Sequence, residues 1–292
     1  MERRLFGNVN GKSGKYHGTE MKDSFRIMIA ILGIAAAMPV YSETIYSTGF
    51  EPPTFSPGSI NGQDNWTSAG SSGATPAAVI STENPNQGTQ DLLIDGSQFG
   101  SSPGVSAVHA SFFNANDLMP IVTVQTDARL DGAIDPNGKV TANLETTGAN
   151  NGSTSILFLG EWVLSSDGQA SAVAFDDTNH TASVVFTTPI NLGQYYTLGI
   201  QLNFAVRTIN FFFDGTAVGS APLNPALTSN EYDGSILALL GSSAGDAAAY
   251  KAYYDNFSET ASVPEPELPS LLLIGSGVAF LARRVLSRRL RA

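Results

Sequence analysis

The sequence predicts an all-β protein whose central part, residues 43–262, folds as one antiparallel β-sandwich of the jelly-roll type. Three observations predict this fold. Apolar and polar residues alternate with a period of two over many short segments, as in strands with one buried face. Turn-forming residues separate these segments, and no long amphipathic helix interrupts them. A pattern of this kind over about 220 residues is enough for one sandwich with its own core.

The predicted strands follow one another at short intervals. The clearest alternation runs over 198–204, where four apolar residues alternate with Gly199, Gln201 and Asn203. Further strands are expected at 122–130, 140–144, 156–164, 182–186, 209–213 and 236–240. Asp214-Gly215 lies between two apolar runs and predicts a hairpin turn. The Ser/Gly/Thr/Pro-rich stretch 68–85 is expected to be a surface loop.

The charges are distributed unevenly along the chain. The net charge is −11, and the residues between Glu43 and Ser262 include 21 acids but only four Lys or Arg. Basic residues gather instead in 1–42 and 283–292, a distribution typical of an exported acidic domain with membrane-directed ends. An acidic domain does not attract nucleic acid. The absence of cysteine excludes disulfides, thiolate metal sites and a Cys nucleophile.

Residues 21–42 have the three parts of a secretory signal peptide. Lys22 and Arg26 form a positive start, 27–38 is a short apolar core, and Val40 to Ser42 suits cleavage before Glu43. The apolar core is too short for a stable spanning helix, and a buried helix is the alternative interpretation. Residues 1–20 are polar and precede a second methionine, so we expect them to be an upstream extension, with translation beginning at Met21.

Residues 263–292 form the second membrane-directed segment. The triplet Pro264-Glu265-Pro266 precedes an apolar run, 268–282, which is the predicted transmembrane helix. The run reaches about 22 Å, and its flank together with snorkelling arginines brings it near the ~30 Å of a bilayer core. The basic cluster that follows favours a cytoplasmic C-terminus and consists of Arg283, Arg284, Arg288 and Arg289. Domain 43–262 would then lie outside the inner membrane.

This tail resembles the PEP-CTERM sorting signal of exported bacterial proteins. The triplet, the Leu/Gly-rich span with Gly275 and Gly277, and the terminal arginines occur in the same order. The resemblance implies processing by an exosortase, a membrane protease, in bacteria that make exopolysaccharide. An ordinary tail anchor after a Pro-rich linker leaves the triplet unexplained. We therefore expect export by the secretion machinery, anchoring in the inner membrane by one span, and release to the cell surface or extracellular matrix.

Parts of the central domain resemble the concanavalin A-like (laminin-G-like) jelly roll. Residues 50–66 look like its opening strand and loop, 209–215 like its strand ending in Asp-Gly, and 253–257 like its closing strand. The resemblance implies that the closing strand pairs beside the first. It also implies a structural calcium ion that ties these two strands together, with Glu51 and Asp255 at the matching places. The alternative is that Glu51 is a surface acid and Asp255 a turn acid.

The same fold contains glycoside hydrolases, which need two carboxyl groups facing the scissile bond. Laminarinase-like enzymes carry theirs on one strand as Glu-x-Asp-x-x-Glu, and no such run is found here. Glu161 is the only acid in its predicted strand, and the adjacent Asp176 and Asp177 would point to opposite faces. The Gly-x-Ser-x-Gly match at 241–245 has no histidine after it, so we expect a turn there.

We therefore expect a non-catalytic surface or exopolysaccharide-associated protein that is structural or glycan-binding. The alternative is a divergent glycan-cleaving or glycan-modifying enzyme on the same fold, which would need two or more acids converging on the concave face. Core packing is the more common use of large aromatic residues, and stacking on sugar rings is the alternative. The residues to which both interpretations apply are Trp66, Trp162, Tyr232, Tyr253 and Tyr254. The sequence assigns no ligand-binding residue.

Overall fold

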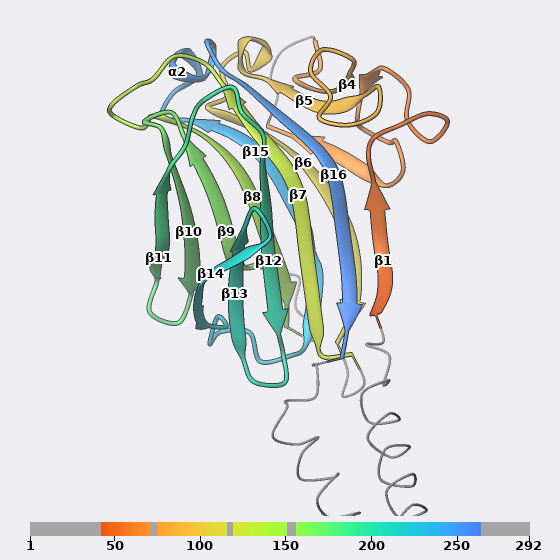
Figure 1. Cartoon of the computed structure of the whole chain (residues 1–292), viewed down its shortest axis with the longest axis vertical. Coiled ribbons are helices and arrows are strands. Elements are labelled where there is room, and N and C mark those ends of the chain that lie inside the picture. The colour runs from red at the N-terminus through yellow and green to blue at the C-terminus, as the bar shows by residue number, and fades with distance from the viewer. Residues whose placement is uncertain (1–41, 71–74, 116–118, 151–155, 264–292) are drawn as a thin grey trace, which may run out of the picture. The chain divides into compact units, whose positions relative to one another are not determined.

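The computed structural model describes residues 42–70, 75–115, 119–150 and 156–263, which form two antiparallel β-sheets packed face to face (Figure 1). The predicted signal peptide (apart from Ser42), the sorting triplet, the span 268–282 and the arginine cluster lie outside the described residues. Within the part of the chain that is described, no helix is long and apolar enough to cross a membrane. The fold class is therefore an all-β sandwich, as the alternation predicts.

The first sheet, sheet A, has the strand order β14-β13-β12-β7-β16-β5-β4-β2, and β1 also pairs with β16. Its strands in chain order are β1 (Ser42–Thr48), β2 (Gly58–Ser59), β4 (Ala78–Ser81), β5 (Asp91–Asp95), β7 (Ile121–Asp131), β12 (Tyr196–Asn203), β13 (Thr208–Phe213), β14 (Thr216–Pro222) and β16 (Lys251–Ser262). A short 3-10 helix, Gly96–Gln98, follows β5.

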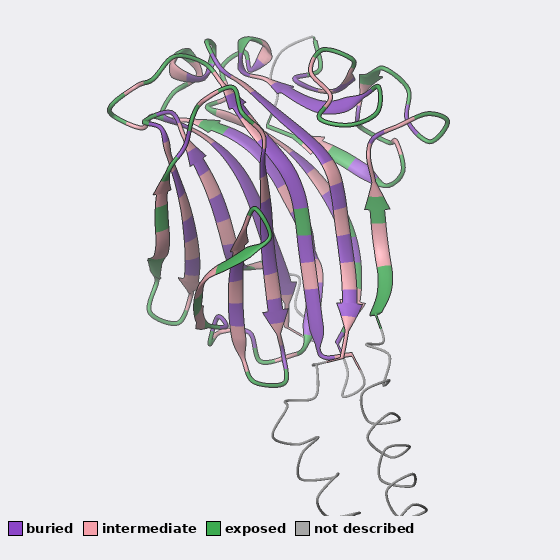
Figure 2. Ribbon diagram, in the orientation of Figure 1, coloured by how far each residue is buried: buried purple, intermediate pink, exposed green. Residues whose placement is uncertain are grey.

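The second sheet, sheet B, has the order β11-β10-β9-β8-β15-β6-β3. Its strands are β3 (Trp66–Ala69), β6 (Gly104–Asn114), β8 (Val140–Ala149), β9 (Ile156–Ser165), β10 (Gln169–Asp176), β11 (Thr181–Pro189) and β15 (Glu231–Gly241). A four-residue helix, α2 (Ala244–Ala247), follows β15. Burial is concentrated on the central strands of both sheets, while the edge strands β11 and β14 and the peripheral β1 are largely exposed (Figure 2).

The predicted strands and the predicted hairpin are confirmed, and one expected loop is wrong. Asp214 and Gly215, both at positive φ, connect β13 to β14. The stretch 68–85 was expected to be a loop, but it contains the end of β3 and all of β4. Ala78 and Ile80 alternate with more exposed neighbours and are buried in the core. The Ser/Gly-rich composition around β4 hides its four-residue alternation.

Aromatic side chains join the two sheets through the core. Trp162 of β9 donates its indole N–H to the carbonyl of Gly199 on β12, at 2.9 Å. Tyr254 of β16 donates from its hydroxyl to the carbonyl of Ala238 on β15, at 2.6 Å. Both side chains are fully buried, so their polar atoms need these partners.

The first and last strands lie side by side, as the jelly-roll resemblance implies (Figure 1). Their register runs from Ser42 opposite Ser262 to Thr48 opposite Phe257. The upper part of β16 pairs with β5 instead. Between the two halves the β16–β7 register shifts, and Asn256 has a φ of 49°, so β16 carries a bulge next to Asp255.

Candidate functional site

Two glutamates face each other across neighbouring strands of sheet B. Glu145 of β8 and Glu161 of β9 are direct partners in the antiparallel register. Side chains in such positions start about 4.5–5.5 Å apart, measured between Cβ atoms. Asn143, two residues before Glu145, donates its amide to a carboxylate oxygen of Glu161. These three side chains form the centre of what we call the outer-face site.

The outer-face site lies on the side of sheet B that points away from sheet A. Trp162 follows Glu161 directly and reaches the opposite sheet through its bond to Gly199. Because successive side chains of a strand point to opposite faces, Glu161 points outward. Leu144, the partner of Trp162, lies in the core, so its neighbours Asn143 and Glu145 point outward too.

Apolar side chains surround the two glutamates on this face. In one row across the sheet the strand partners are Val108, Ile236, Glu145, Glu161, Val173 and Val184. Close to Glu161, Phe158 of β9 packs against Phe175 of β10, with their ring centroids 5.8 Å apart. Among the described residues, five of the seven exposed large apolar side chains belong to strands of this sheet: Phe112, Ile156, Phe158, Val184 and Leu240. A concentration of this kind is typical of an interaction surface.

Both glutamates hold their protons more tightly than usual. Burial raises the pKa of Glu145 to about 6, although the Asn143 hydrogen bond opposes this. Burial, together with the charge of Glu145, raises the pKa of Glu161 to about 8. At neutral pH the pair therefore carries about one shared proton, as coupled carboxyl groups do.

One acceptor at this site lacks a partner. Asn143 is only 3% exposed, and its Oδ1 atom has no hydrogen-bond partner. Leaving a buried amide oxygen unsatisfied costs about 1–3 kcal/mol. The geometry therefore offers one carboxyl pair and one free amide oxygen to a ligand that can donate hydrogen bonds.

The predicted calcium residues, Glu51 and Asp255, lie at a different place, where the loop between β4 and β5 covers sheet A. Asp255 Oδ2 accepts from the backbone N–H of Gln87 at 2.8 Å, and Glu51 Oε1 accepts from that of Thr89 at 2.6 Å. Burial raises the pKa of Asp255. Burial alone would raise the pKa of Glu51. Hydrogen bonds from the Thr89 side chain and from the backbone N–H groups of Gln90 and Thr89 outweigh burial and lower the pKa of Glu51. Both carboxylates therefore attach this loop to the sheet.

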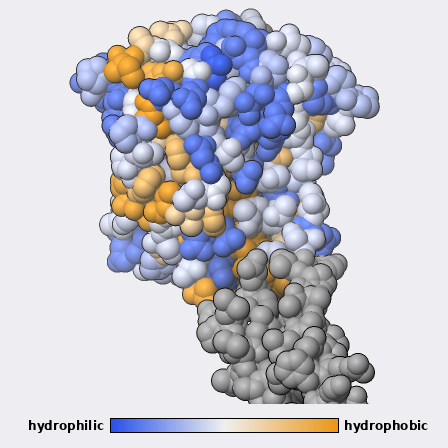
Figure 3. Space-filling view, viewed as in Figure 1, coloured by the Kyte–Doolittle hydropathy of each residue, from blue (hydrophilic) through white to orange (hydrophobic). Residues whose placement is uncertain are grey.

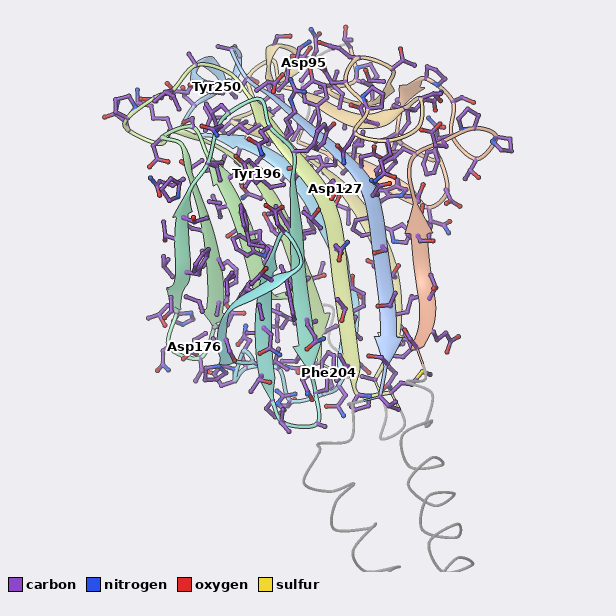
Figure 4. All side chains as sticks on the ribbon, viewed as in Figure 1. Asp95, Asp127, Asp176, Tyr196, Phe204 and Tyr250 are labelled. Carbon is purple, nitrogen blue, oxygen red and sulfur yellow. The ribbon has the colours of Figure 1, made fainter. Side chains whose placement is uncertain are left out.

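The structure brings Glu51 and Asp255 close to each other beside Gly49. A Cβ atom added at Gly49 would lie 3.7 Å from both Asp255 Oδ1 and the Cγ of Glu51. Two further aspartates join Asp255 on the outer face of sheet A. Asp127 on β7 is the strand partner of Asp255 and is labelled beside β16 in Figure 4. Asp91 directly precedes Leu92, and Leu92 on β5 is the strand partner of Tyr254.

Asp91 fits a cation better than Glu51 does. It is fully buried, its Oδ1 has no partner, and burial together with the charge of Asp255 raises its pKa to about 7. The surface around this loop, near the top of Figure 3, is mainly hydrophilic. In the described part of the chain no three His, Asp or Glu side chains are grouped so that they could hold a metal ion. Calcium at Asp255 therefore stays a prediction.

A third polar group lies inside the sandwich. Ser111 bonds Nδ1 of His109 at 2.7 Å, and the same nitrogen lies 3.4 Å from the buried carboxylate of Glu259. The hydroxyl of Tyr232 donates to Glu259. Ser111 and Glu259 both contact Nδ1 of His109, whereas a catalytic triad needs the serine and the carboxylate on opposite nitrogens of the ring. This group therefore connects the two sheets rather than activating a nucleophile.

The remaining candidate residues have structural roles. Ser243, in the Gly-x-Ser-x-Gly match, is the N-cap of α2 and accepts from the N–H of Asp246. Asp176 accepts from Asn179 in the turn after β10. The five aromatic residues considered for sugar stacking are all buried. Tyr253 differs from the other four because it lies on the outer side of sheet A, where Arg129 stands 5.4 Å from its ring.

Glu145 lies on a different strand from Glu161, so a motif that places both carboxylates on one strand does not find it. A signal was nevertheless present: Glu145 directly follows the predicted strand 140–144, Glu161 lies in the next predicted strand, 156–164, and the Gly/Asn-rich stretch 148–152 lies between them. A hairpin between these strands brings such positions together. Asp91 and Asp127 could not be found in this way, since their proximity to Asp255 depends on the order of strands in sheet A.

No protein-family model matches the chain, and no curated protein matches it. Solved structures do match. A carbohydrate esterase from the Shiga toxin-encoding bacteriophage phi24B has a TM-score of 0.53 and 11% identity, with 76% of this chain and 100% of that chain covered. An endo-1,3-beta-glucanase from Streptomyces sioyaensis has a TM-score of 0.52 and 15% identity, with 78% of this chain and 99% of that chain covered. At such identities the likeness shows the fold alone, an antiparallel two-sheet β-sandwich consistent with a jelly roll.

Proposed function

We propose that this protein is an exported, surface- or exopolysaccharide-associated protein that binds glycan through its outer-face site without cleaving it. The observation that carries the proposal is the unpartnered Oδ1 of Asn143 beside Glu145 and Glu161. Sugar hydroxyls donate hydrogen bonds to such acceptors, and the apolar C–H faces of sugar rings suit Phe158 and Phe175. Small-ligand sites commonly combine an apolar lining with a few convergent polar groups.

Export and sorting belong to the same proposal and rest on the two ends of the sequence. The signal peptide would carry the chain across the inner membrane, and the span 268–282 would hold it there. An exosortase would then cut near Pro264-Glu265-Pro266 and release the sandwich. This order of events places the outer-face site where extracellular polysaccharide is available.

The binding proposal is tested with the full chain on immobilised polysaccharides and a glycan array. Phe158→Ala removes an exposed aromatic side chain from the outer-face site and should weaken binding at least fivefold. Val206→Ala is the matched control, because Val206 is also highly exposed but lies in the turn between β12 and β13. Equal binding by both variants, or no binding by the unaltered protein, would overturn the proposal.

A glycan-cleaving enzyme is the second candidate, and the paired carboxyl groups favour it. Two carboxyl groups whose pKa values are held apart, here at about 6 and about 8, can divide the roles of acid and base. The test is release of reducing ends from bound polysaccharide. Cleavage that is lost in both Glu145→Gln and Glu161→Gln would establish the enzyme, whereas binding without cleavage supports the first candidate.

A further inference from the structure

The outer-face site is negatively charged in a sheet that offers no strong positive charge. The seven strands of sheet B contain no lysine or arginine. Their single histidine, His109, is buried between the sheets beside Glu259. Glu145 and Glu161 therefore repel each other without a basic side chain from a neighbouring strand to offset them. A polysaccharide rich in carboxylate or sulfate groups would increase this repulsion.

The hydrogen-bonding groups of the site are mainly acceptors. The Asn143 amide N–H is already donated to Glu161, while Asn143 Oδ1 is free. Three side chains, Asn143, Glu145 and Glu161, thus present oxygen atoms on one face. A protonated amino group has three N–H donors and a positive charge, so it matches three such acceptors in number and in sign.

We propose that the outer-face site recognises a glycan through a protonated amino group, so that its ligand is a polysaccharide rich in de-N-acetylated hexosamine. This inference rests on the proposed glycan-binding function and specifies its ligand class. The ammonium group bonds to Asn143 Oδ1 and to the two carboxylates. The neighbouring sugar ring lies against the apolar surface that includes Phe158 and Phe175.

A divalent cation is the competing occupant. The Asn143 amide N–H donates to Glu161, so this side chain already occupies part of the space beside that carboxyl group. Calcium takes six to eight oxygen ligands, whereas an ammonium group has three N–H donors, which match the acceptors of Asn143, Glu145 and Glu161 in number. The observations therefore favour the amino group, and calcium becomes an outcome of the test.

The experiment is isothermal titration of the full chain at pH 7 with hexosamine oligosaccharides of one length, either de-N-acetylated or fully N-acetylated. The amino form should bind at least tenfold more tightly. Glu145→Gln and Glu161→Gln should each reduce this preference about tenfold. Glu43→Gln, on the exposed start of β1, is the matched control and should leave the preference unchanged. Binding of the amino form should also release protons from the carboxyl pair, measured as a dependence of the heat on the buffer.

Each contrary result has a distinct meaning. Equal binding of both oligosaccharides, lost in Phe158→Ala, would keep the glycan-binding function and overturn the amino-group assignment. Failure of both oligosaccharides and of all array glycans would overturn both. Binding that requires calcium and disappears with a chelator would assign the site to a metal ion. Equally tight binding of oligolysine would show that the site does not recognise a sugar.

Discussion

Replacing Glu161 by glutamine should change how the stability of the sandwich depends on pH. Glu161 titrates at 4.5 in an ordinary environment and at about 8 in the folded protein, because burial and the charge of Glu145 penalise its ionised form. A raised pKa of this kind stabilises the fold fully below pH 4.5, and that stabilisation is lost as the pH rises toward 8. At about 1.4 kcal/mol per pKa unit, the loss is about 5 kcal/mol. Such a loss is a large part of the 5–15 kcal/mol typical of a folded domain.

The assay is urea unfolding of the full chain at pH 5, 6, 7 and 8.5, with Glu161→Gln compared with the unaltered protein. The variant should gain about 4 kcal/mol relative to the unaltered protein between pH 5 and pH 8.5, since glutamine does not ionise and this window covers most of the titration. Glu145→Gln should remove part of the same pH dependence, and the double variant should show less than the sum of the two effects. Glu43→Gln controls for loss of an exposed carboxylate. Parallel pH profiles for Glu161→Gln and the unaltered protein would refute the reasoning.

Three further predictions concern other parts of the chain. Calcium at a hundredfold excess over its dissociation constant should stabilise the fold by about 2.7 kcal/mol and raise the melting temperature. Asp255→Asn should weaken that response, and a melting curve that calcium leaves unchanged would refute the site. Tyr254→Phe should lower the free energy of unfolding by about 1–3 kcal/mol, measured in urea, because the carbonyl of Ala238 loses a buried donor. Replacing Pro264-Glu265-Pro266 by alanines should leave the whole tail attached, as measured by mass spectrometry, and should keep the protein in the membrane. Normal release of the variant would mean that the triplet is only a linker.

Local patterns predicted most of the fold. Alternation over 198–204 identified a strand with one buried face, and β12 follows it closely. Asp214-Gly215 marked a hairpin because its residues tolerate the positive φ that such a turn requires. The pairing of the first strand with the last came from the family resemblance and not from any local signal. The first strand does pair with the last, with Ser42 opposite Ser262, but it lies at 42–48, before the residues 50–66 that resemble the opening strand and loop.

The candidate site was harder to predict because it depends on register. Glu145 and Glu161 belong to one hairpin, yet β8 and β9 carry a register irregularity at Thr146, close to the glutamates. A slip of one residue would send one glutamate into the core, so the alternation alone cannot fix their partnership. The unpartnered oxygen of Asn143 is a property of packing, and nothing in the sequence distinguishes it from a solvated amide.

The position of β16 has a mechanical consequence. This strand pairs with β7 along one side and with β1 and β5 along the other, and it ends at Ser262, directly before the segment that would anchor the chain. Tension transmitted from an anchor would therefore pull β16 along its own axis. Its hydrogen bonds to three neighbours would be loaded together in shear, instead of opening one after another like a zipper. As long as the tail is uncut, a chain held by that anchor would gain resistance to forced unfolding from this arrangement of its last strand.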